Sequence, residues 1–323
     1  MATPTELGRT RYTQVTSVIR AVMEQVQALW KGMSAATIED DLEGAAGAAI
    51  VAAVAEGQLT VADAAQAYIA AQMAAQGGSA VAEAALVAAA FAGVAPDGGP
   101  LETLLFLPAI GVRRRLAAGM LPEEAMLGGL ADMARYASTS IADTARSSDR
   151  VGMAANRNCV AYVRVVQLPA CSRCIVLSGQ MYRYSEGFLR HPNCDCQTLP
   201  LREREWPSVP TPQQLFDRLP EQEQRRVFTV AGADAIRSGA DLGQVVNARR
   251  GMSRPGASTT TEGITRRGLY GRRMRRAGGE FARFPGQRYS RSTTPRLTPE
   301  AIFRQASGRD EQLQLLRRYG YIV

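Results

Sequence analysis

Apolar side chains recur at steps of three and four residues along the first half of the chain, which is the spacing of one helix face. The clearest series, Val15, Ile19, Val22, Val26 and Leu29, predicts an amphipathic helix over residues 5–31. Further Ala-rich segments, separated by glycine or proline, predict helices over residues 34–56, 60–76, 79–93, 101–119 and 122–148. The last of these helices either ends near Ser148 or runs past Asn158 with a break at Gly152. The first 150 residues are therefore expected to be all-α.

Three positions mark expected breaks in these helices. Gly57 is predicted to end one helix, and Thr60, with Asp63 three positions later, to begin the next in the manner of a capping box. Pro108 is predicted to interrupt the helix that contains it, because proline lacks the backbone N–H group.

The most apolar stretches, residues 44–55 and 79–96, predict buried helices and no membrane partner. The first is too short to span a bilayer, and the second is rich in weakly hydrophobic alanine and contains Glu83. The N-terminus shows no basic segment followed by an apolar run, so no signal peptide is expected.

The pattern changes to that of strands after residue 158. Cys159 to Leu168 is rich in valine and predicts a strand that Pro169 ends, and Gln180 to Tyr184 predicts a second strand after a turn at Ser178-Gly179. Residues 199–212 contain four prolines and predict a linker, with Trp206 as an anchor. Short helices are predicted over residues 212–219, 220–238, 241–248, 299–307 and 308–319.

A cluster of potential metal ligands follows the first strand. It contains four of the five cysteines and the only histidine of the 323 residues, which are Cys171, Cys174, His191, Cys194 and Cys196. Thiolate and imidazole are the ligands that Zn²⁺ prefers at tetrahedral sites, and two tight turns joined by a hairpin can supply four of them. The sequence predicts a structural Zn²⁺ site that uses Cys171, Cys174, His191 and either Cys194 or Cys196.

Two other interpretations of these cysteines are disulfides and buried thiols. The odd number of cysteines argues against a disulfide framework. Cys159 is expected to be a small buried thiol outside the site. A hydrolytic zinc centre would use more histidine and carboxylate and keep a water position open, so the thiolate-rich set favours a structural role over catalysis.

Together these patterns predict a mainly α fold with a small α+β zinc-stapled hairpin module and an Arg-rich extended C-terminal segment. Five parts are expected along the chain. They are an Ala-rich helical domain (1–150), a strand plus zinc-binding hairpin module (151–200), a helical segment (201–252), an Arg/Gly-rich flexible arm (253–296) and C-terminal helices (297–323).

The charge of the chain is divided unevenly. Residues 1–150 carry 10 basic and 16 acidic side chains, whereas residues 151–323 carry 28 and 14. All but one of the 38 basic residues are arginine, whose guanidinium group binds phosphate and carboxylate with two hydrogen bonds. A basic half of this size favours an anionic partner. The arginines expected to contact nucleic acid or a partner are Arg249, Arg250, Arg266, Arg267, Arg272, Arg273, Arg275 and Arg276.

An ordered set of motifs in the second half resembles the phage Mu F-like family of minor head proteins. The set comprises YVRVVQLPACSRCIVLSGQMYR, FLRHPNCDC, ADAIRSGAD leading into VVNARRGM, TTTEG, and a final LTPEAIFRQAS followed by LLRRYGYIV. It is similar to the version found in phages of high-GC, actinobacterial hosts. The resemblance covers roughly residues 120–323. It implies a structural, non-enzymatic protein of the virion, at the capsid interior or portal vertex, that is present in the host cytoplasm during assembly. The partners it implies are the portal protein, the major capsid or scaffold protein and packaged DNA.

Two alternatives belong to other functional classes. One is a zinc-stabilised nucleic-acid-binding protein with no place in a particle. The other is an enzyme, either a nuclease or an ADP-ribosyltransferase within residues 200–323. The RYSRSTT stretch and Glu280 are the loose sequence features that suggest it. A single histidine and the lack of a clustered set of carboxylates in the sequence argue against a nuclease.

Overall fold

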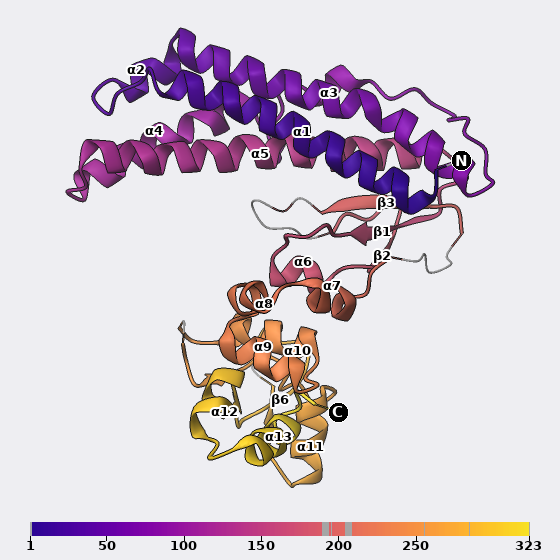
Figure 1. The fold of residues 1–323 in the computed structure, drawn as a ribbon, viewed down its shortest axis with the longest axis vertical. Coiled ribbons are helices and arrows are strands. Elements are labelled where there is room, and N and C mark those ends of the chain that lie inside the picture. The colour runs from indigo at the N-terminus through magenta and orange to yellow at the C-terminus, as the bar shows by residue number, and fades with distance from the viewer. Residues whose placement is uncertain are drawn as a thin grey trace. The chain divides into compact units, whose positions relative to one another are not determined.

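The computed structural model describes residues 2–188, 194, 196–203, 209–254, 256–283 and 285–322. The chain is mainly helical with three small sheets in this described part. It divides into two compact units (Figure 1). The first comprises Met1–Gln167 and Gly179–Val209, and the second comprises Leu168–Ser178 and Pro210–Val323.

The first unit is built on long helices that run side by side (Figure 1). They are α1 (Pro4–Trp30), α3 (Ala45–Ala75), α4 (Leu101–Ala117) and α5 (Pro122–Ala154), with the short helix α2 (Ile38–Glu43) and a 3-10 helix η1 (Ala88–Phe91). Val22, Val26, Val54, Val61 and Ile141 belong to the core between α1, α3 and α5. The periodicity of α1 therefore predicted the face that the helix buries.

Helix α3 continues through Gly57, so the predicted break at Gly57 and new start at Thr60 are wrong. A Cβ atom on Gly57 would lie 3.0 Å from side-chain atoms of both Ile141 and Val22. Glycine is present because α1 and α5 approach α3 closely at this position. By length and apolar composition α3 could cross a membrane, but in this structure it contributes to the core of the helical unit.

Two further helix predictions need correction. Pro108 lies inside α4 without interrupting it, and its side chain is buried. Residues 79–93 are not a helix apart from η1, and Val81 and Val87 within them are exposed. Even an Ala-rich helix of this length is only marginally stable when no neighbouring element packs against it. Here side chains of α3 hold the segment instead, because Gln58 and Gln66 accept hydrogen bonds from the main-chain N–H groups of Gly93 and Leu86, at 2.9 Å each.

A three-stranded antiparallel sheet completes the first unit, in the order β2-β1-β3. Its strands are β1 (Ala161–Val165), β2 (Met181–Arg183) and β3 (Gln197–Leu201). Tyr162 pairs with Tyr182 on one side and with Pro200 on the other. The two predicted strands are confirmed, but residues 199–201, predicted as part of a linker, belong to a buried strand. Trp206, predicted as an anchor, lies outside the described residues.

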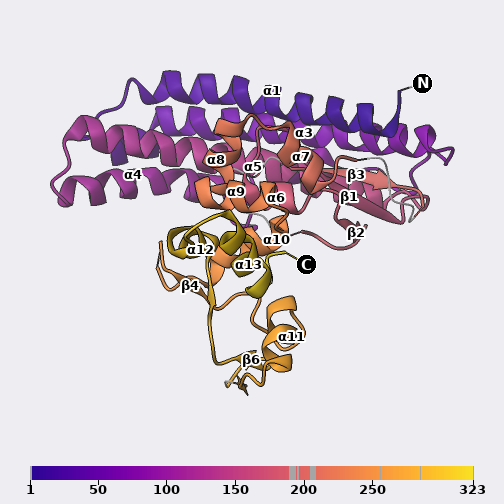
Figure 2. The same ribbon diagram turned by 60° about the horizontal axis from the view of Figure 1, so that its bottom comes forward.

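Short helices and two-residue strands make up the second unit. The helices are α6 (Ser172–Val176), α7 (Pro212–Arg218), α8 (Glu221–Phe228), α9 (Val230–Arg237), α10 (Leu242–Ala248), η2 (Arg249–Gly251), α11 (Leu269–Arg276), α12 (Pro299–Gln305) and α13 (Arg309–Arg318). The strands are β4 (Thr259–Thr260), β5 (Phe281–Ala282), β6 (Arg291–Ser292) and β7 (Arg296–Leu297). β4 pairs with β7, and β5 pairs with β6 beside α11 (Figure 2).

The described part of residues 253–296 does not form the extended, flexible arm that the sequence predicts. Arg296 is fully buried, its guanidinium group lies 4.3 Å from the ring centroid of Tyr321, and it donates hydrogen bonds to Gln244. Tyr270 stacks on Tyr319 at 5.9 Å between ring centroids. Aromatic residues of this segment and of the C-terminus thus form a small core. The high content of glycine, serine and arginine in the sequence gave no indication of it.

Candidate functional site

The sheet of the first unit places two of the predicted ligands. Cys194 and Cys196 directly precede β3, whose first residue, Gln197, pairs with Val165 of β1. Arg164, the neighbour of Val165, pairs with Thr198 and therefore lies close to the cysteine pair. Cys174 lies on α6, which begins after Cys171.

Three cysteine sulfur atoms gather at one point. The Sγ atoms of Cys174, Cys194 and Cys196 lie within 4.8 Å of one another, and each side chain is at most 2% exposed. Sulfur ligands of a tetrahedral zinc ion at about 2.3 Å lie roughly 3.8 Å apart, so this donor set fits a thiolate metal site. A buried group of three cysteines that could hold a metal ion is therefore present, as the sequence predicts in outline.

The two other predicted ligands considered are Cys171 and His191. Cys171 is exposed and is not one of the three gathered sulfurs. Its Sγ caps α6 by accepting a hydrogen bond from the N–H group of Cys174 at 3.4 Å. His191 lies outside the described residues. The sequence offered Cys194 and Cys196 as alternatives, whereas the structure brings both of them to Cys174.

Cys159 is separate from this group. It is 3% exposed, its Sγ donates a hydrogen bond to the carbonyl oxygen of Ala161 at 3.4 Å, and burial raises the pKa of its thiol to about 12. A thiol of this kind stays protonated and is a poor metal ligand.

Two buried arginines, Arg164 and Arg146, contact Cys194 and Cys196. Arg164 donates hydrogen bonds to the sulfur atoms of Cys194 and Cys196 at 3.4 and 3.5 Å. Arg146 of α5 donates to the main-chain carbonyl oxygens of the same two residues at 2.8 and 3.1 Å and forms an ion pair with Asp143. Positive charge beside the sulfur atoms favours the thiolate form, which is the form that binds metal. The sequence singles out neither arginine, because its 37 arginines look alike.

A polar network fixes β3 against the helices of the first unit. Arg11 of α1 and Asp149 of α5 form a buried ion pair of 2.7 Å, and Thr198 of β3 donates a hydrogen bond to the same carboxylate at 3.3 Å. Burial raises the pKa of Asp149, and the Arg11 guanidinium opposes that effect. The hydroxyl of Tyr68 donates to the carbonyl oxygen of Thr198 at 2.7 Å. These contacts fix β3, the strand that follows Cys196, against the helices of the first unit.

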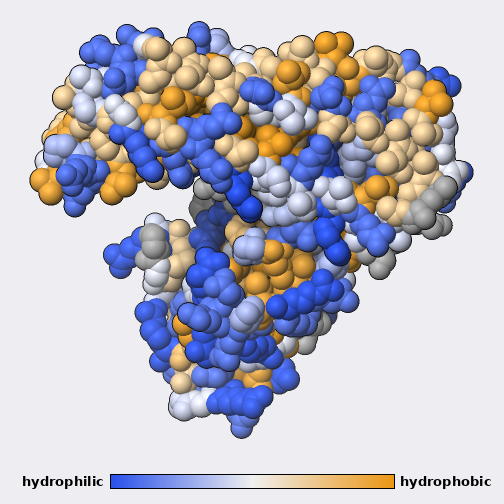
Figure 3. Space-filling model, turned by 45° about the horizontal axis from the view of Figure 1, so that its top comes forward, coloured by the Kyte–Doolittle hydropathy of each residue, from blue (hydrophilic) through white to orange (hydrophobic). Residues whose placement is uncertain are grey.

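The predicted contact arginines fall into three groups. Arg249 is half-buried and donates to the carbonyl oxygen of Phe228, and Arg273 donates to that of Ile322 at 3.2 Å, so both stabilise the fold. Four others line an open hollow of about 540 Å³ in the second unit. Its lining comprises Arg266, Arg267, Arg272, Arg275, Arg283, Arg288, Tyr289 and Ser290. Arg250 and Arg276 are exposed outside it. Hydrophilic side chains cover much of the face of this unit seen in Figure 3.

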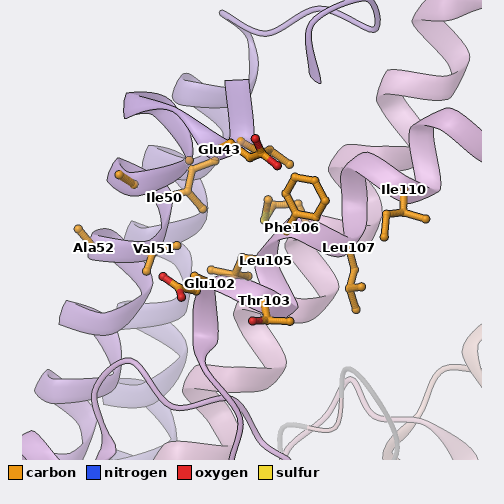
Figure 4. A pocket seen from close by; sticks show the side chains of 14 residues that line it. Glu43, Ile50, Val51, Ala52, Glu102, Thr103, Leu105, Phe106, Leu107 and Ile110 are labelled. Carbon is orange, nitrogen blue, oxygen red and sulfur yellow. The ribbon is translucent and has the colours of Figure 1, made fainter. Parts of the chain in front are cut away.

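A second hollow, of about 680 Å³, lies in the helical unit and is mostly apolar (Figure 4). Ile50 and Val51 of α3 and Phe106 and Leu107 of α4 line it, with the carboxylates of Glu43 and Glu102 among them. Its described lining contains no cluster of polar or nucleophilic groups that would mark a catalytic centre.

Comparison of the chain with protein-family models, with curated proteins and with solved structures finds no match.

Proposed function

We propose that the chain is a structural minor head protein of a tailed phage whose hairpin module is held together by a Zn²⁺ ion. The observation that carries the metal part is the convergence of three buried cysteine sulfur atoms on one point. The ordered motifs from Tyr162 to the C-terminus, which resemble Mu F-like proteins, carry the assignment to a phage head.

The donor set supports a structural rather than a catalytic ion. Cys174, Cys194 and Cys196 would supply three thiolates, and Cys171 or His191 would complete the tetrahedron. With that fourth ligand in place the site would have no open position for water, which hydrolytic zinc sites keep. Arg164 would offset the negative charge of a zinc centre with three or four thiolate ligands.

The partners proposed are the portal protein, the major capsid or scaffold protein and packaged DNA, in the capsid interior or at the portal vertex. The net negative charge of residues 1–150 and the net positive charge of the remainder suit partners of opposite sign for the two parts. Clustered exposed arginines in the second unit support an anionic partner for that unit.

Two measurements test this proposal. Metal analysis of the purified wild type should find about one zinc per chain, and Cys174→Ser and Cys196→Ser should each lose most of it. The matched control is Cys159→Ala, which removes a buried thiol outside the group and should keep the metal. Full metal content in both ligand variants would refute the zinc site.

The second measurement is peptide counting by mass spectrometry in gradient-purified particles of the encoding phage. A small fixed ratio to the portal protein is expected. Absence from particles, together with abundance in infected cytoplasm, would overturn the head assignment. It would favour the second candidate, a zinc-stabilised nucleic-acid-binding protein, which the arginine-lined hollow also supports.

A further inference from the structure

Six arginines from two separate segments converge on the hollow in the second unit, which we call the arginine hollow. Arg266 and Arg267 precede α11, Arg272 and Arg275 lie on it, and the last two, Arg283 and Arg288, come from the segment between β5 and β6. All six side chains are exposed. The sequence groups the first four with four other arginines and does not single out Arg283 and Arg288.

The charge of the hollow is not compensated within the described part of the chain. No carboxylate lines it, and no described acidic residue forms an ion pair with any of the six arginines. Guanidinium groups remain charged at every physiological pH, so the six repel one another when no anion is bound. An anion with several charges would relieve that repulsion.

Aromatic rings hold some of these arginines from the side. The guanidinium groups of Arg267 and Arg288 lie 5.6 and 5.3 Å from the ring centroid of Tyr289, and that of Arg266 lies 5.8 Å from that of Phe281. Such cation–π contacts restrict long side chains that would otherwise be mobile. Because Tyr289 already contacts two arginines, its ring serves to position them rather than to stack on a base.

The arginine hollow continues into a second one. Arg283 and Arg288 also line a neighbouring open hollow of about 670 Å³, with Pro285, Gly286 and Gln287. The two hollows share these two arginines, and the other residues that line the second one are uncharged. The positive charge is therefore that of the six arginines, which come from two segments of the chain. Six separate guanidinium groups suit a linear anion with repeated charges better than one compact ion.

We propose that the arginine hollow binds the phosphodiester backbone of nucleic acid, without reading its sequence. This inference rests on the DNA contact in the proposed function and names the residues that make it. Guanidinium groups bind phosphate oxygens with paired hydrogen bonds, and backbone contacts of this kind carry no base information. Arg249 and Arg273, which are used by the fold, are not part of the contact.

The test compares two triple variants of the full-length protein that lose the same charge. One is Arg267→Gln, Arg272→Gln and Arg288→Gln in the hollow. The control is Arg254→Gln, Arg309→Gln and Arg317→Gln, which are exposed arginines of the same unit outside it. Binding of a fluorescent single-stranded 20-mer and of its duplex is measured by anisotropy over a range of salt concentrations, with several unrelated sequences.

We expect the wild type to bind all sequences alike. The hollow variant should bind the single strand about tenfold or more weakly, and the slope of log affinity against log salt should fall by about 2, because three phosphate contacts are lost at about 0.7 each. The control should stay within about twofold of the wild type. Equal losses in both variants would overturn the proposal, since they would indicate diffuse charge alone.

Competition separates the possible anions. A DNA strand without label should displace the probe, whereas tripolyphosphate and polyglutamate at equal charge concentration should not. Displacement by tripolyphosphate would replace the proposal with a compact polyphosphate site, and displacement by polyglutamate would replace it with an acidic protein surface. Wild type that binds DNA through the hollow but is absent from particles would refute the head assignment and leave this inference standing.

Discussion

Arg11 and Asp149 form an ion pair of 2.7 Å in which the two side chains are 1% and 0% exposed. Arg11 also donates a hydrogen bond to the carbonyl oxygen of Val61, and Thr198 donates one to Asp149, so the pair joins three helices and β3. A buried pair of this kind favours one arrangement of the elements that it joins, because moving any of them would leave a buried charge without its partner.

Removing one member of this pair should destabilise the first unit strongly. Arg11→Met and Asp149→Leu are each expected to lower the free energy of unfolding by about 3–5 kcal/mol, because the remaining charge is left buried without a partner. The double variant should lose less than the sum of the two. Urea titration monitored by circular dichroism measures all three. Losses that add up fully would show that the two side chains act independently.

Arg164 should govern the affinity of the cysteine group for zinc. Arg164→Met removes the hydrogen bonds to Cys194 and Cys196 while keeping the apolar stem, and zinc affinity is expected to fall by about 10-fold or more. Competition with a chelator of known affinity gives the constant. Arg183→Met, which changes an exposed arginine of β2, is the control and should bind zinc as the wild type does.

Gly57→Ala should destabilise the protein, although alanine is the better helix former. The new methyl group would lie 3.0 Å from side-chain atoms of Ile141 and Val22, and crowding of this kind costs about 1–3 kcal/mol. The control is the exposed position Ala49 of the same helix, where only helix propensity acts. There the reverse change, Ala49→Gly, should destabilise the protein by about 1 kcal/mol. Thermal melting of both variants is the measurement. Stabilisation by Gly57→Ala would mean that α3 does not pass through this contact.

High pH should weaken the wild type more than Cys159→Ala. Burial raises the pKa of the Cys159 thiol from 9.0 to about 12, so the folded state favours the protonated form. The stabilisation from this group is complete below pH 9, where the unfolded thiol is also protonated, and is lost between pH 9 and about 12. Urea midpoints of both proteins, followed from about pH 8 to about pH 11, should diverge above the ordinary thiol pKa. Parallel curves would contradict the assignment.

Local signals in the sequence predicted much of the fold. The apolar steps of residues 5–31 predicted α1, and runs of valine and the Ser178-Gly179 turn predicted β1 and β2. The failures occur where distant parts of the chain decide the outcome. Gly57 looks like a helix stop unless the neighbours α1 and α5 are known, and Ala-rich residues 79–93 look helical although side chains of α3 hold them as a loop.

The candidate metal centre was predictable only in its list of ligands. CxxC and HxxCxC spacing gave five candidates, but spacing along the chain does not decide which of them gather, and the structure groups Cys174, Cys194 and Cys196. The buried arginines could not be found at all. In a chain with one lysine and 37 arginines, Arg164 beside sulfur and Arg288 beside solvent carry the same local signature.

The interleaving of the two units along the chain affects the order in which they can form during synthesis. Helix α6 leaves the ribosome before residue 180, yet it packs against α7 and α10, which are made tens of residues later. Residues 168–178 must therefore wait for partners that are not yet translated. A fragment that ends near residue 209 would keep this segment and lack those partners. Truncating the gene from its 3′ end would therefore not yield the first unit alone.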